Sequence, residues 1–72
     1  MTAYAVIIEG GDRSFSAYAP DLPGCVATGE SLEQVEQRIR EAIRLHVESL
    51  RAHGEPVPQP STAAVRLVDD VA

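Results

Sequence analysis

Several residue types are absent or rare in this 72-residue sequence, and their scarcity excludes some classes of protein. It has no lysine, no tryptophan, one cysteine (Cys25) and three aromatic residues. A lone thiol cannot form an internal disulfide, which excludes the disulfide framework of small secreted proteins. No run of about 18 apolar residues and no basic-plus-apolar leader occurs. We therefore expect a soluble, cytoplasmic protein.

Positive charge is also scarce. Six arginines face eleven acidic residues, for a net charge of −5. Nucleic acids and anionic membranes both require a basic surface, so we expect the chain to bind neither directly. An acidic domain is better matched to a basic protein partner, although the charge could also serve solubility alone.

The length predicts one domain over residues 1–72. Hydrophobic residues make up 44% of the chain and charged residues 24%, which is typical of a globular protein. A core of this size buries only about 60% of the surface of the unfolded chain, so stability is often helped by association.

Three short strands are predicted in the first half, at residues 3–9, 14–19 and 25–28. In the first, Tyr4, Val6 and Ile8 share one face, and the other face is also apolar. This pattern is typical of a strand inside a sheet or beneath another subunit. Gly10, Gly11 and Asp12 predict a hairpin turn, with glycine supplying the positive φ.

One amphipathic helix is predicted over residues 31–53. Ser31 with Gln34 three residues later fits a capping box, and apolar residues then repeat every three or four positions, Ile43 among them. Gly54 supplies the stop. Residues 55–61, with a proline at every second position, predict an extended connector, and residues 63–68 a fourth strand.

The predicted fold is therefore α+β, in the order β-β-β-α-β and in two layers. The first three strands form an antiparallel meander, and the helix packs on one face of the sheet. If the fourth strand pairs beside the first, the sheet order is 3-2-1-4. One helix leaves the opposite face bare, which makes that face a candidate surface for self-association.

Three motifs in this order resemble a known family. They are PDLPGC at residues 20–25, TGES at 28–31 and GEPVPQPS at 54–61, after the strand YAVIIE. Together they are similar to the HicB antitoxins of bacterial and archaeal toxin–antitoxin systems, over about four fifths of the chain.

The resemblance implies a partial RNase H-like sheet with one helix, and a partner that is a small basic HicA-type toxin, which degrades mRNA and is masked by the antitoxin. Members typically carry a second, C-terminal DNA-binding domain, for which no residues follow here. We therefore expect an antitoxin-like, non-enzymatic domain that associates with itself, as a homodimer or higher oligomer, and possesses no DNA-binding activity of its own.

The carboxylates, histidines and the cysteine are the candidates for metal binding or catalysis. A nuclease of the RNase H type binds metal ions with clustered carboxylates, but Glu9, Asp21 and Glu30 show no ligand motif. His46 and His53 lie seven residues apart, whereas metal-binding pairs on a helix are usually closer. Cys25 has no neighbouring base in any known pattern. We therefore predict no catalytic residue, no metal site and no cofactor.

The predicted partner-binding residues are the three aromatics and two residues of the loop that follows the second strand. Aromatic side chains often anchor interfaces, although packing between strands is the more common role. The set is Tyr4, Phe15, Tyr18, Asp21 and Leu22. Two other functions remain open, a stand-alone homo-oligomeric binding domain without a toxin and a metal-dependent hydrolase.

Overall fold

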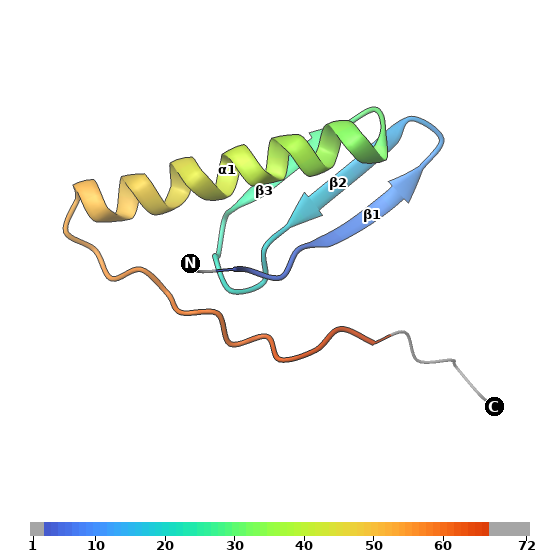
Figure 1. Cartoon of the computed structure of the whole chain (residues 1–72). Coiled ribbons are helices and arrows are strands. Elements are labelled where there is room, and N and C mark those ends of the chain that lie inside the picture. Colours follow the sequence, from blue (N-terminus) through green and yellow to red (C-terminus); the bar gives the residue numbers. More distant parts are fainter. Residues whose placement is uncertain (1–2, 67–72) are drawn as a thin grey trace.

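The computed structural model describes residues 3–66, which form a three-stranded sheet with one helix lying along it (Figure 1). The elements are β1 (Ile7–Gly11), β2 (Ser14–Tyr18), β3 (Val26–Gly29) and α1 (Leu32–Ala52). Both strand pairs are antiparallel, and the sheet order is β1-β2-β3. The predicted α+β class, the meander and the single helix on one face are thus confirmed.

The hairpin turn lies later than the sequence predicted. Gly11 pairs with Ser14, so the two-residue turn is Asp12 and Arg13, which take positive φ angles of 48° and 66°. This is the backbone twist that tight hairpins need, and aspartate tolerates it. Gly10, predicted to serve the turn, lies within β1 with a φ of 122°.

The first strand begins at Ile7 and not at residue 3. Ile7 pairs with Tyr18, the last residue of β2. Beyond Tyr18 the chain turns away, because the amide of Ala19 donates to the carbonyl of Cys25 and Pro20 has no amide hydrogen. The backbone at residues 3–6 therefore has no neighbouring strand to pair with among the described residues.

The helix ends confirm the predicted caps. Ser31 has extended backbone angles, and its hydroxyl accepts a hydrogen bond from the amide of Gln34 at 3.0 Å. The Gln34 side chain returns a bond by accepting from the amide of Glu30 at 2.7 Å. The first bond is that of a capping box, whereas the second reaches the amide of the residue before the cap and not that of Ser31 itself. His53 is the C-cap, followed by Gly54 with a φ of 66°.

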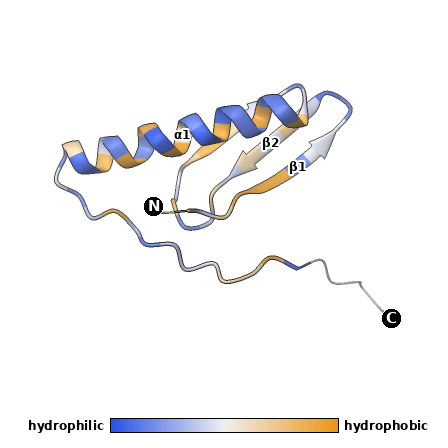
Figure 2. Ribbon diagram, in the orientation of Figure 1, coloured by the Kyte–Doolittle hydropathy of each residue, from blue (hydrophilic) through white to orange (hydrophobic). Residues whose placement is uncertain are grey.

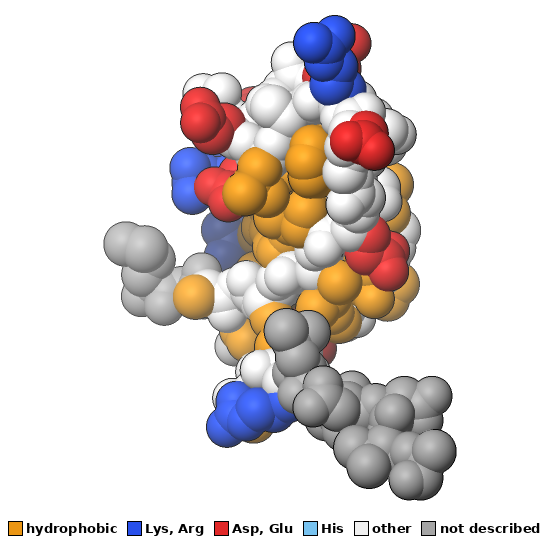
Figure 3. All heavy atoms as spheres, turned by 90° about the vertical axis from the view of Figure 1, so that its right-hand side faces the viewer, with side chains coloured by type: hydrophobic (Ala, Val, Ile, Leu, Met, Phe, Trp, Pro, Cys, Tyr) orange, Lys and Arg blue, Asp and Glu red, His pale blue; other side chains and the backbone are white. Residues whose placement is uncertain are grey.

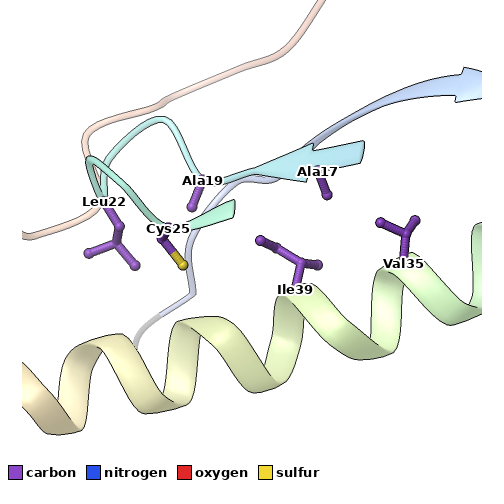
Figure 4. Packing of buried hydrophobic residues seen from close by; sticks show 6 residues of the cluster. All are labelled: Ala17, Ala19, Leu22, Cys25, Val35 and Ile39. Carbon is purple, nitrogen blue, oxygen red and sulfur yellow. The ribbon is translucent and has the colours of Figure 1, made fainter. Parts of the chain in front are cut away.

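The core lies between α1 and the sheet, and Figure 4 shows its six buried side chains. Val35 and Ile39 point from the helix toward the strands and the loop after β2. Ile43 is half-buried and packs against the edge of this cluster. The buried set is Ala17, Ala19, Leu22, Cys25, Val35 and Ile39.

Residues 55–66 form neither helix nor strand, so the sheet has three strands within the described residues. Of the predicted fourth strand, residues 63–66 run free of the sheet and residues 67 and 68 lie outside the described residues. In Figure 1 this segment leaves the helix end, passes beneath the domain and continues away from it. A strand needs a bonded neighbour, and this path offers none.

Candidate protein-binding surfaces

The sheet face opposite the helix carries an apolar row across all three strands. Ile7 pairs with Tyr18, and Tyr18 pairs with Val26. Paired residues in a sheet point to the same side, so these three side chains adjoin. Tyr18 is 41% exposed and Val26 65% exposed, both high for such large apolar side chains. We call these three residues the open-face row.

A second row lies beside it and is polar. Glu9 pairs with Ser16, and Ser16 pairs with Thr28. All three are exposed. Each is two positions from the residue of the open-face row on its own strand, so it points to the same side of the sheet. The open face therefore offers apolar contact at one end and hydrogen-bonding groups with one carboxylate at the other.

A groove runs between β1 and α1 on the other side of the sheet. The helix packs over β3 and β2 more than over β1, so the inner side of β1 stays partly uncovered. We call this space of about 320 Å³ the β1–α1 groove. It is lined by Tyr4, Val6, Ile8, Glu36, Ile39, Arg40 and Ile43. Figure 2 shows the hydrophobic first part of β1 and the hydrophobic side of α1 that faces the sheet.

The segment after the helix is fastened to the domain at two points. The Tyr4 hydroxyl donates to the carbonyl oxygen of Pro58 at 2.6 Å. Asp21 then accepts from the amides of Ser61 and Thr62 at 3.1 and 3.2 Å, and from the Ser61 hydroxyl at 2.8 Å. We call the second contact the Asp21 clasp. It joins the loop after β2 to a segment 40 residues further along the chain.

The Asp21 clasp is expected to open in acid. The hydrogen bonds from Ser61 and Thr62 hold the pKa of the Asp21 carboxyl below its ordinary value. A carboxyl with a lowered folded pKa stabilises the folded form above its unfolded pKa of about 4, and that contribution is lost as the pH falls through the folded pKa. The amide signals of Ser61 and Thr62 in NMR spectra should therefore be constant at neutral pH and move below about pH 4.

Asp21→Asn provides the control, since it removes the titrating group and should abolish the transition at both amides. The amide of Ala17, within the sheet, should not move over the same range. Constant shifts for Ser61 and Thr62 down to pH 2 would contradict the clasp.

The five predicted partner-binding residues lie at different places. Tyr18 belongs to the open-face row, Tyr4 lines the β1–α1 groove and Asp21 forms the clasp. Phe15 packs against the core from the helix side of β2, and Leu22 is completely buried. A side chain without exposed surface can affect a partner only by shaping its loop, whereas Tyr4, Tyr18 and Asp21 are partly accessible.

Some surface residues were missed by reasoning from sequence. Val26 and Ile7 join Tyr18 only because of the strand register, which no local pattern gives. Ser61 and Thr62 meet Asp21 across 40 residues. The only feature of the sequence that could have indicated this contact is the pair of hydroxyl residues just after the prolines.

The residues weighed for chemistry lie apart. Within residues 3–66, no three His, Cys, Asp or Glu side chains gather as a set of metal ligands. Cys25 is buried in the core, where burial raises the pKa of its thiol and disfavours the thiolate. At His53, ring Nδ1 lies 2.7 Å from the carbonyl oxygen of Ser49, so this side chain binds the end of its own helix. The part of the chain seen in the structure has no helix long and apolar enough to cross a lipid bilayer.

Comparison with known sequences decides the family. A profile described as the HicB-like antitoxin of bacterial toxin–antitoxin systems matches residues 4–70, nearly the whole chain. The chain belongs to the HicB-like antitoxin family. The expectation from the three sequence motifs is thereby confirmed, and the antitoxin role is the one its family carries.

Several curated proteins resemble this HicB-like chain. A UPF0150 protein of Synechocystis is 42% identical over 57 residues, which cover 78% of this chain and 72% of that protein. A UPF0150 protein of Thermoplasma acidophilum is 35% identical over 63 residues, covering 86% and 91%. An uncharacterised 14.9 kDa protein of Haemophilus phage HP1 is 30% identical over 56 residues, covering 78% of this chain but 42% of that protein. No solved structure matches the chain.

Proposed function

We propose that this HicB-like chain is an antitoxin that covers a small basic HicA-type toxin with its open sheet face, and so blocks the toxin from degrading mRNA. The observation that carries the proposal is the open-face row, Ile7, Tyr18 and Val26. A small domain that leaves large apolar side chains together on an uncovered sheet face presents a surface suited to a protein partner.

Charge supports the choice of partner. The chain has a net charge of −5, and Glu9 stands beside the open-face row. A basic protein would be attracted over a distance by this field, which raises the association rate. Such a toxin meets mRNA in the cytoplasm, and we place the antitoxin there. The role is one of binding and involves no catalytic step, cofactor or direct contact with nucleic acid.

The test is co-expression with the small basic protein encoded beside this gene. The chain should restore growth and co-purify with that protein. Val26→Asp, which puts a charge into the open-face row, should weaken the complex at least tenfold and lose the rescue. Leu45→Asp is the matched control, because Leu45 is 51% exposed on the helix, away from the open face.

Two outcomes would count against the proposal. Absence of both complex and rescue by the unchanged protein would remove the toxin as partner. Equal loss for Val26→Asp and Leu45→Asp would remove the open face as its binding site.

A second candidate function is a homo-oligomeric binding domain that works without a toxin. Two features away from the open-face row favour it. The β1–α1 groove is lined largely by hydrophobic side chains, and the outer edge of β1 is unpaired within residues 3–66. On this view the predicted fourth strand at residues 63–68 completes the sheet in the order 3-2-1-4, as a partial RNase H-like domain. For the remaining alternative, a metal-dependent hydrolase, residues 3–66 hold no cluster of metal ligands that favours it.

A further inference from the structure

Among residues 3–66, none fills the β1–α1 groove on its strand side. Val6 and Ile8 are half-buried and face Ile39 and Ile43 of the helix across the groove, with Glu36 and Arg40 also among its lining residues. Figure 3 looks at the side of the molecule where the hairpin ends and shows hydrophobic side chains gathered in the middle, with acidic and arginine side chains around them. Apolar side chains inserted from outside would remove this surface from water.

The backbone beside the groove is also unpaired. Within residues 3–66, β1 is bonded to β2 on one side only, so its outer edge presents amide and carbonyl groups without a strand partner. Residues 3–6 lead into β1 and pair with no strand of the part of the chain that the structure describes. An edge of this kind readily accepts an added strand. An extended segment with apolar side chains on one side would fit both the groove and the edge.

The chain's own C-terminal segment has that character. In the sequence AAVRLV at residues 63–68, Val65 and Leu67 alternate with Arg66. Residues 63–66 are exposed, and Val65 is 55% exposed. Six residues in a strand span about 20 Å, enough to pair along residues 4–8 of a neighbouring edge.

The Asp21 clasp directs this segment outward. Ser61 and Thr62 are fixed at the loop after β2, and Figure 1 shows the chain running on from there, away from its own sheet. A segment held in this way is exposed, so another molecule can bind it. A second copy of the chain offers the same groove and edge, and two copies can exchange segments about a twofold axis to give a closed dimer.

Charge fits the same arrangement. In a strand, Arg66 points to the side opposite Val65 and Leu67. With those two side chains in the groove, Arg66 would lie on the face that carries Glu9 of the other copy. An arginine and a carboxylate attract each other there, whereas an acidic residue at position 66 would be repelled.

We propose that residues 63–68 form an arm that pairs with the outer edge of β1 in a second copy of the chain and inserts Val65 and Leu67 into its β1–α1 groove. This arm exchange deepens the second candidate function and rests on self-association. It is independent of toxin masking, which uses the opposite sheet face.

Sedimentation equilibrium of the full chain tests the arm. The unchanged protein should dimerise, and Val65→Asn should weaken the dimer at least tenfold, because the side chain at position 65 is exposed in the single chain and enters an apolar groove in the dimer. Ala64→Asn is the matched control, since it adds the same polar group to the other side of the arm. Neither variant should change the thermal unfolding of a dilute sample.

Cysteine pairs distinguish exchange from folding back. A mixture of Val6→Cys and Val65→Cys chains should yield a disulfide-linked pair containing one of each, and a mixture of Val26→Cys and Val65→Cys chains should not. In a chain carrying both Val6→Cys and Val65→Cys, an internal disulfide at high dilution would show that the arm serves its own sheet and would overturn the proposal.

The experiments distinguish failure of the arm exchange from failure of self-association and of toxin masking. A dimer of equal strength with Val65→Asn would overturn arm exchange and leave self-association standing. An unchanged protein that is monomeric at every concentration would overturn both, while growth rescue by the antitoxin would still report on toxin masking.

Discussion

Ile39→Ala is expected to lower the free energy of unfolding by about 2 to 5 kcal/mol, through the transfer free energy of the lost side chain and the cavity left behind. Ile39 is 4% exposed and lies in the middle of the six-residue core. A domain of this length has a total stability of roughly 4 to 11 kcal/mol. The substitution therefore removes a large share of it, which urea denaturation followed by circular dichroism will measure.

Leu45→Ala is the matched control on the same helix. Leu45 is 51% exposed, and alanine is the best helix former, so the expected change stays within about 0.5 kcal/mol. If both variants lose the same stability, the helix does not bury the face that the structure assigns to it.

The helix is where sequence and structure agree most closely. Residues 31–53 were predicted, and the structure gives Leu32–Ala52 with Ser31 and His53 as caps. Its signals are local, because a capping residue bonds an amide three residues away and an apolar stripe repeats every turn. Reasoning from sequence succeeds where the interacting groups are neighbours along the chain.

The sheet was predicted less well at its ends, for a physical reason. Residues 3–6 have strand-like side chains, but pairing stops at Ile7 because β2 ends opposite it. Residues 63–66 likewise have a strand pattern and no neighbouring strand in the single chain. A strand exists only with its partner, so the missing pairs are what the arm exchange would supply between two copies.

The candidate site was only partly foreseen. Tyr18 was named from its residue type, whereas the open-face row depends on the register that sets Ile7 and Val26 beside it. Asp21 was named as a loop residue for binding a partner, and it accepts hydrogen bonds from Ser61 and Thr62 of its own chain. Such contacts join distant parts of the chain and leave no periodic pattern.

We thus propose a different partner for each of two sides of this HicB-like domain. The open-face row faces away from the helix and is proposed for the toxin. The β1–α1 groove lies on the helix side and is proposed for a second copy. Since β1 contributes Ile7 to one and Ile8 to the other, its register must be correct for both to form.

Gly10→Ala tests this dependence on β1. Gly10 has a φ of 122°, a conformation that residues with a side chain rarely adopt. An added Cβ would also collide with the carbonyl oxygen of Ser14 and lie 3.0 Å from the Cα of Phe15. Both are backbone atoms of β2, so no side-chain rotation can relieve the contact. We expect a loss of about 1 to 3 kcal/mol from the backbone strain, and more from the collision.

Gly11→Ala gives the comparison one residue away. A Cβ at Gly11 would meet nothing within 4 Å, and its φ is not positive, so stability should change by about 0.5 kcal/mol or less. Chemical denaturation of both variants measures the difference. Because Gly10 sets the pairing of β1 with β2, Gly10→Ala should also weaken toxin rescue and self-association, both of which Gly11→Ala should retain. Equal stability of the two variants would mean that the hairpin does not have the register described.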